Sequence, residues 1–171
     1  MEYSIGMLFL LFIIYSFLGW CMEMVVCYFA TRKWVNRGFL IGPICPIYGW
    51  GCLLIILLLK RYLDDPLVLF VMSMVLCSLL EYYTSYLMEK LFKARWWDYS
   101  NKKYNLNGRV CLFNLLIFSI GSFIMIRKFI PLLDSVLFVE NSFSVIGVFI
   151  LFVFFVIDLT VSIIKNYDSS S

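Results

Sequence analysis

Long apolar segments alternate with short polar ones along the whole chain. A membrane-spanning helix needs ~20 predominantly apolar residues, and each of these segments is about that long. They predict five transmembrane helices, at about residues 5–29, 44–62, 66–90, 110–129 and 142–164. The polar connections leave no room for a soluble catalytic domain. We therefore expect a single integral membrane domain over residues 1–171, with an all-α fold: a polytopic helix bundle.

The start of the second span breaks this regularity. The segment Gly38–Gly51 is apolar, yet it holds four of the nine glycines and two of the four prolines. Such a sequence cannot stay helical throughout, and irregular backbone survives in a membrane only where protein or a water-filled cavity satisfies its polar groups. The segment predicts a re-entrant or broken start to the second helix. Farther on, Asp65 and Pro66 are the residue types that cap and begin a helix, here the third.

Composition supports the membrane class and narrows the chemistry. Of the 171 residues, 63% are hydrophobic and 15% are charged, whereas an ordinary soluble domain has ~45–50% and ~25%. The sequence contains no histidine, no C-x-x-C pair among its six cysteines and no glycine motif that cradles phosphates. We expect no metal, no cofactor and no nucleic-acid partner, and the sequence leans away from an enzyme.

The positive charges gather on one side of the predicted topology. Ten of the fourteen basic residues fall in the loops after the first and third spans and in the C-terminal tail, and four fall elsewhere. The positive-inside rule then places the N-terminus outside and the C-terminus in the cytoplasm. The first apolar run has no basic leader and no small-residue cleavage site, so we expect a retained span.

Three acids lie inside predicted spans, where each costs roughly 2.5–3.5 kcal/mol. Glu23, Glu81 and Asp158 all occupy the second halves of spans that run in one direction, which predicts one depth for all three. The broken segment and Asn114 open their spans on the same face. We therefore expect a polar chamber in the cytoplasmic half of the bundle. Its walls are these acids and Asn114, its hydrogen-bond donors are Tyr48 and Tyr99, and its counter-charges are Arg37, Arg95 and Arg109.

Each member of this chamber has a simpler interpretation. A glutamate can pair with an arginine only to fix the register of two helices. Gly19, four residues before Glu23 on the same helix face, can serve only close helix packing. The cluster Trp96–Tyr99 is typical of any membrane interface, and the basic loop around it can reflect topology or anionic lipid alone. Asp158, between Ile157 and Leu159, has no polar motif around it.

Several short motifs, in order, resemble a bacterial family of ABC-transporter permeases (type IV, CmpB-like), which are small polytopic membrane proteins. The motifs are Gly19–Trp20 with Glu23, Asn36–Leu40, Gly42–Pro43, Pro46–Gly49, Leu80–Tyr82, Glu89 with Phe92, Trp97–Ser100 and Asn107–Leu112. They cover roughly residues 5 to 125 and add Glu89, Asp98 and Asn107 to the candidate site. The resemblance implies a bacterial cytoplasmic membrane protein whose transport needs a separate ATPase.

Three functions remain open on the sequence. In a transporter subunit, the broken span and the acids form a substrate site, and a homo-oligomer or a partner membrane chain completes the pathway. In a membrane enzyme acting on a lipid, two carboxyls serve as acid and base and the arginines hold a phosphate head group. A structural subunit carries no chemistry. The resemblance favours transport, with the lipid bilayer and an ATPase subunit as partners.

Overall fold

The computed structural model describes residues 3–36, 38–62, 64–124, 127–128 and 142–168. Its main helices are α1 (Ile5–Thr31), α2 (Pro46–Leu59), α3 (Pro66–Phe92), α4 (Leu112–Ile124) and α6 (Ser142–Asp168). A short 3-10 turn, η1 (Lys60–Tyr62), follows α2. The two-residue strands β1 (Asn105–Leu106) and β2 (Val110–Cys111) pair antiparallel before α4. The protein is thus an all-α membrane bundle, as the hydrophobic pattern predicts.

Among the described residues, three helices are long and apolar enough to cross a membrane, namely Ile5–Thr31, Pro66–Phe92 and Val145–Asp168. The helices at Pro46–Leu59 and Leu112–Gly121 are apolar but shorter. The short α2 follows from the broken segment, because residues 38–45 form bends and extended backbone and the helix begins only at Pro46. The end predicted for the fourth span, at residue 129, lies outside the described residues.

Local signals explain where α3 begins. The Asp65 side chain accepts a hydrogen bond from the Val68 backbone N–H at 3.1 Å, and Pro66 occupies the first turn. The predicted cap is therefore confirmed, and it matters because a bare helix start leaves backbone donors without partners. Helices α1 and α3 each end on a left-handed residue, Arg32 and Lys93, whose N–H bonds back to a carbonyl of the last turn.

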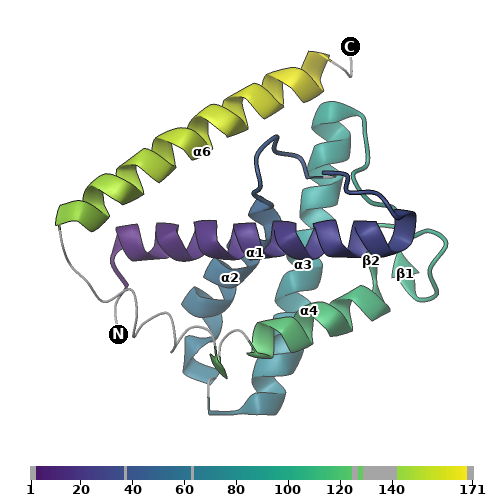
Figure 1. The fold of residues 1–171 in the computed structure, drawn as a ribbon. Helices are drawn as coiled ribbons and strands as arrows, with labels where there is room; N and C mark the ends of the chain where they lie inside the picture. Colours follow the sequence, from purple (N-terminus) through teal and green to yellow (C-terminus); the bar gives the residue numbers. More distant parts are fainter. Residues whose placement is uncertain (1–2, 37, 63, 125–126, 129–141, 169–171) are drawn as a thin grey trace.

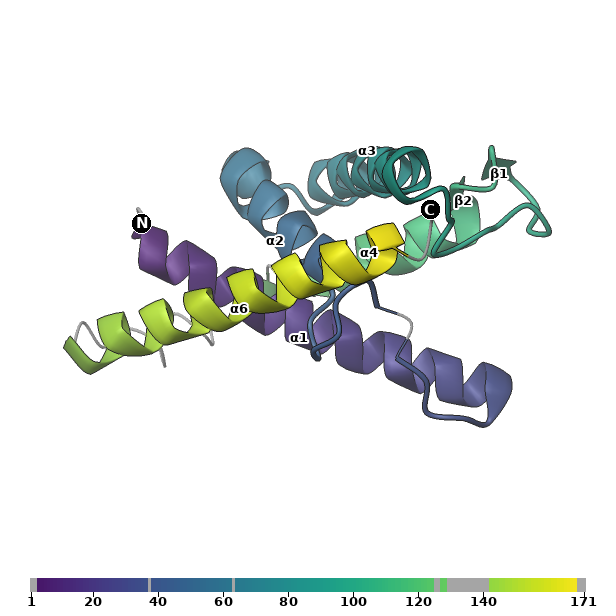
Figure 2. The same ribbon diagram turned by 90° about the horizontal axis from the view of Figure 1, so that it is seen from above.

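The helices do not all run side by side. Figure 1 shows α1 running across the view and α2 and α3 running down it. In Figure 2, seen from above, α3 is foreshortened. Close backbone contacts join α1 to α2, α2 to α3, and α3 to α4. Helix α6 touches α1 and α3 more sparsely. The chain therefore builds a four-helix unit from α1–α4, with α6 laid across it.

The apolar core lies where α1 and α2 meet the start of α3. Its buried members are Leu11, Tyr15, Cys52, Ile55, Ile56, Leu59 and Leu69. Two glycines allow the close approach of α1 and α2. A Cβ on Gly49 would overlap Ser16 and Phe12, and a Cβ on Gly19 would overlap the ring of Tyr48. Small residues at helix crossings are how membrane helices come close enough to pack.

Candidate functional site

Two carboxyls and two phenols meet between α1, α2, α3 and the loop after α3. The Tyr48 hydroxyl donates a hydrogen bond to Glu23 Oε1 at 2.5 Å. The Tyr99 hydroxyl donates to the Glu81 carboxyl, and the Asn114 side chain bonds to Tyr99 in turn. The two carboxyls interact electrostatically. We call these five residues the acid–tyrosine cluster: Glu23, Tyr48, Glu81, Tyr99 and Asn114.

The cluster is held together by features of the local sequence. Gly19 lies one turn before Glu23, and its missing side chain leaves room for the Tyr48 ring. That ring also packs against Phe118 of α4, with 5.4 Å between ring centroids. The close packing at Gly19 therefore agrees with the structure. It also supports the cluster, because the space at Gly19 lets Tyr48 reach Glu23.

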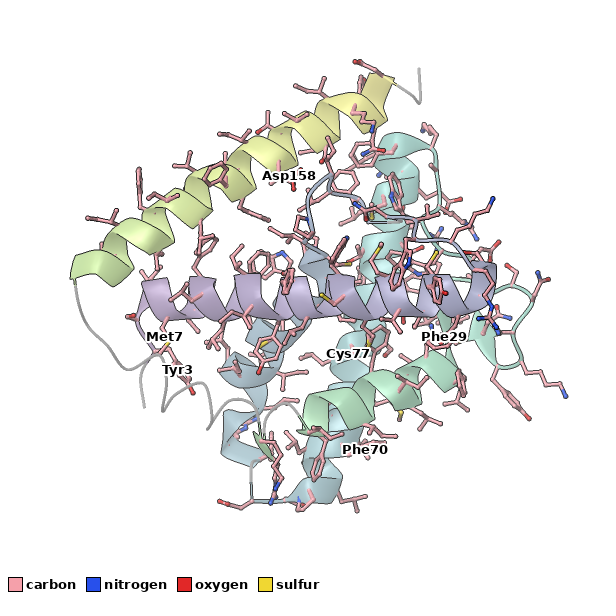
Figure 3. All side chains as sticks on the ribbon, viewed as in Figure 1. Tyr3, Met7, Phe29, Phe70, Cys77 and Asp158 are labelled. Atoms are coloured by element: carbon pink, nitrogen blue, oxygen red, sulfur yellow. The ribbon has the colours of Figure 1, made fainter. Side chains whose placement is uncertain are left out.

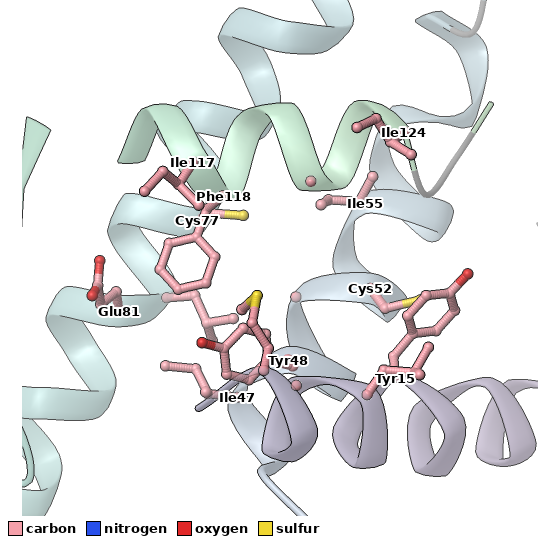
Figure 4. A pocket seen from close by; sticks show the side chains of 16 residues that line it. Tyr15, Ile47, Tyr48, Cys52, Ile55, Cys77, Glu81, Ile117, Phe118 and Ile124 are labelled. Carbon is pink, nitrogen blue, oxygen red and sulfur yellow. The ribbon is translucent and has the colours of Figure 1, made fainter. Parts of the chain in front are cut away.

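A cavity of about 360 Å³ lies beside the cluster. Figure 4 shows it between α1, α2, α3 and α4, with Glu81 near one end, Tyr15 near the other and Tyr48 between them. Most of its wall is apolar, and representative side chains are Leu18, Met22, Ile55, Cys77, Leu80 and Phe118. Sites for small molecules commonly have this form, a mainly hydrophobic space of ~300–1,000 Å³ with a few placed polar groups.

Glu81 is the polar group of the cavity that lacks a full set of partners. Its side chain is 4% exposed, and its Oε2 atom has no hydrogen-bond partner among the described residues. A buried acceptor left in this state costs about 1–3 kcal/mol, and more when it is charged. Native structures satisfy nearly all such atoms, so an unsatisfied one at a cavity wall points to a ligand site.

Tyr99 is suited to hold Glu81 because it keeps its proton. Burial raises the pKa of the Tyr99 phenol, and the neighbouring Glu81 raises it further. The phenol therefore remains a hydrogen-bond donor at any physiological pH. Asn114 anchors the Tyr99 phenol, and Tyr99 in turn holds the carboxyl of Glu81, a residue that lines the cavity.

The arginines expected as counter-charges to the buried acids bind a different acid. Arg95 Nε lies 2.9 Å from Glu89 Oε1, and Arg109 forms an ion pair with Glu89 Oε2. Arg109 is 8% exposed, donates to Ser85 and lies over the rings of Tyr82 and Tyr86. The predicted counter-charge role is therefore not observed for these two arginines, and Arg37 lies outside the described residues.

Two other predicted site residues organise the polar loop. Asp98 accepts from the backbone and hydroxyl of Ser100, and these bonds lower the Asp98 pKa. Asn107, at a positive φ of 55°, donates to the Tyr82 hydroxyl at 2.9 Å. Asn107, Glu89, Arg95 and Arg109 fasten the β1–β2 hairpin to α3, whereas the hydrogen bonds of Asp98 stay within the loop. None of these five residues is among the described residues that line the cavity.

Asp158 belongs neither to the acid–tyrosine cluster nor to the polar loop. Its carboxylate accepts from the backbone N–H groups of Ile41 and Gly42 at 3.1–3.3 Å, and Ser162 assists. Figure 3 labels Asp158 where α6 faces the broken segment. It thus satisfies backbone donors that the irregular segment 38–45 leaves free, which no pattern around Asp158 in the sequence reveals.

The cavity wall is what sequence reasoning missed. Met22, Cys77, Phe118 and Gly121 are ordinary residues of membrane helices, and only the crossing of the helices brings them around one space. Of the predicted site residues, Tyr48 and Glu81 line the cavity, and Glu23, Tyr99 and Asn114 support them.

The fold is an all-α membrane bundle with a mainly apolar cavity and one buried acid, Glu81, in its wall among the described residues. The chain belongs to the family described as "Putative ABC-transporter type IV", whose model matches residues 10–163. No curated protein and no solved structure matches the chain. The family match extends past the predicted motifs and includes Asp158 in α6.

Proposed function

We propose that this protein is the permease-like membrane subunit of an ABC-type transporter and that its substrate binds in the cavity between α1 and α4. The observation that carries this proposal is the Glu81 carboxyl, buried at the cavity wall with one oxygen unpartnered among the described residues. Intramembrane acids of this kind mark substrate or ion pathways in membrane proteins. The family match supports the transport class.

A separate ATPase supplies the energy in this proposal, since the sequence has no nucleotide-binding motif. The basic loops at residues 32–37 and 89–109 are its docking surface and face the bacterial cytoplasm. The hairpin fixed by Arg109 and Glu89 gives the second loop a defined shape for this contact. The pathway needs a second copy of the chain or a partner membrane chain, because four packed helices are few for alternating access.

Co-purification tests the transporter assignment. Tagged protein purified in mild detergent from its native membrane is expected to bring an ATPase, and the complex is expected to hydrolyse ATP. A charge-reversing change in the exposed loop, Lys102→Glu with Lys103→Glu, is expected to weaken that association. A matched change on the other side of the membrane, Arg61→Glu, is the control. A preparation without ATPase activity contradicts the ABC assignment.

The lipid-enzyme alternative receives less support from the geometry. A phosphate-holding site needs free cationic groups, and both Arg95 and Arg109 are engaged by Glu89. The lipid composition of a deletion strain and a Glu81→Gln strain is therefore expected to match the parent. A lost or accumulated phospholipid in both strains would favour the enzyme.

A further inference from the structure

The chemistry of the cavity restricts what can bind in it. Glu81 is the carboxyl of the acid–tyrosine cluster that lines it, and Glu23 is not among the described lining residues. The phenols of Tyr48 and Tyr99 already donate their protons to Glu23 and Glu81. The cluster can therefore accept hydrogen bonds from a ligand, and neither of its phenols has a proton left to donate to one. Glu81 lines the cavity, and its Oε2 atom is a buried acceptor without a hydrogen-bond partner among the described residues.

An anionic ligand would find no positive charge there. No lysine or arginine is among the described residues that line the cavity, and Arg95 and Arg109 are bound to Glu89. A phosphate or carboxylate placed against Glu81 would meet like charge in a low-dielectric space, which is strongly unfavourable. The same field attracts a cation that carries N–H donors.

The rest of the cavity favours a ligand with a large apolar part. Leucine, isoleucine, methionine and phenylalanine side chains form most of the wall, and a molecule that fills the space gains from burying apolar surface against them. We propose that the cavity binds a small lipophilic amine, with its protonated nitrogen hydrogen-bonded to Glu81 and its apolar body between α1, α2 and α4. This inference rests on the proposed function, in which the cavity is the substrate site.

Three molecules with one apolar cage and different head groups test the charge assignment: 1-aminoadamantane, 1-adamantanol and 1-adamantanecarboxylate. Equilibrium dialysis of the full chain in detergent measures binding of radiolabelled amine, and the unlabelled alcohol and carboxylate compete. The amine is expected to bind about ten- to a hundredfold more tightly than the alcohol, because a hydrogen bond between charged groups is stronger by that factor. The carboxylate is expected to compete least.

Two variants locate the binding. Glu81→Gln keeps the shape of the side chain, removes its charge and is expected to erase the preference for the amine over the alcohol. Gly121→Leu places a side chain at the cavity, where a Cβ has open space, and is expected to abolish binding of amine and alcohol alike. Gly147→Leu is the matched control, because Gly147 also has open space and lies on α6 away from the cavity.

The outcomes separate the inference from the proposed function. Stronger competition by the carboxylate or the alcohol than by the amine overturns the amine assignment and leaves a substrate site in the cavity. Amine binding that survives both Gly121→Leu and Glu81→Gln overturns the cavity as the site, and the proposed function falls with it. If Glu81→Gln does not purify as a single species, the competition series on the unaltered protein decides the charge assignment.

Discussion

At the scale of single residues, the arrangement of the site depends on the absence of a side chain at Gly19. A Cβ at this position would overlap the Tyr48 ring, and Tyr48 is the donor that holds Glu23. A methyl group added at Gly19 would therefore displace Tyr48 of α2 and so disturb Glu23, one turn farther along α1.

Gly19→Ala is expected to lower the stability of the protein by about 1–3 kcal/mol through overpacking. Gly51→Ala is the matched control, because its Cβ would lie 3.7 Å from Leu80, an ordinary contact. The control is expected to be neutral or slightly stabilising, since alanine favours a helix over glycine. Thermal unfolding in detergent measures both. Equal stability of the two variants would contradict the close contact of Gly19 with Tyr48.

Arg109 is the residue on which the polar loop depends. It is buried, pairs with Glu89, bonds Ser85 and lies over two tyrosine rings. A lysine keeps the charge but cannot reproduce the planar fork of a guanidinium.

Arg109→Ala is therefore expected to destabilise the protein the most, because it removes the ion pair with the half-buried Glu89, the Ser85 hydrogen bond and the contacts with two tyrosine rings. Arg109→Lys is expected to cost less, yet more than Lys102→Ala on the exposed loop nearby. Thermal unfolding of the three variants checks this order. A stable Arg109→Ala protein would show that the hairpin does not need its ion pair.

At the scale of elements, the broken segment before α2 is completed by α6. Asp158 satisfies the N–H groups of Ile41 and Gly42, and Asn166 donates to the carbonyl of Phe39. Two side chains of α6 thus bond to backbone groups of this irregular segment, and such partners are what allow irregular backbone within a membrane protein.

Asp158→Asn is expected to speed hydrogen–deuterium exchange at the amides of Ile41 and Gly42, because it replaces a charged acceptor with a neutral one. Thr160→Val is the control on the same helix, since the Thr160 hydroxyl bonds to its own helix at Val156. Exchange of the segment is measured by mass spectrometry. Unchanged protection of these amides from exchange in Asp158→Asn would show that the Asp158 hydrogen bonds do not hold this segment.

The elements themselves were largely predictable. Long apolar runs, the Asp65–Pro66 cap and the glycines and prolines of residues 38–51 follow from periodicity and backbone chemistry, and the structure has these helices and this break. The hairpin β1–β2 was not predictable, because each strand has only two residues and depends on left-handed Asn107 and Gly108 between them.

The site was predictable in part. Acids are rare enough in apolar runs that Glu23 and Glu81 were recognisable in the sequence, and tyrosines near them were natural donors. The partners of the arginines were not predictable, since Glu89 on the last turns of α3 competes with the deeper acids and lies closer to the loop that carries Arg95 and Arg109. Parallel spans would have placed Asp158 with the other acids, but α6 faces residues 38–45 instead.

At the scale of the whole molecule, the described helices expose much apolar surface. Many large hydrophobic side chains of α6, including Phe149, Phe152 and Phe154, are exposed. Such surface suits a lipid bilayer, where no hydrophobic cost attaches to it.

The proposed topology makes a separate prediction. A tag at the N-terminus is expected to be accessible to an impermeant reagent on intact cells, and a tag at the C-terminus only after the membrane is opened, because most basic residues fall on the second side. Both tags on one side would mean an even number of spans, and the arrangement of the loops proposed to face the ATPase would have to be revised.

The central claim is that the cavity between α1 and α4 is a substrate site with Glu81 at its polar end. Photolabelling tests it most directly, with an adamantyl amine that carries a diazirine, followed by mapping of the adducts by mass spectrometry. We predict adducts on the cavity side chains Met22, Cys77 and Phe118, suppressed by 1-aminoadamantane and lost in Gly121→Leu. Adducts spread over the exposed side chains of α6, unaffected by the competitor or by Gly121→Leu, would contradict it.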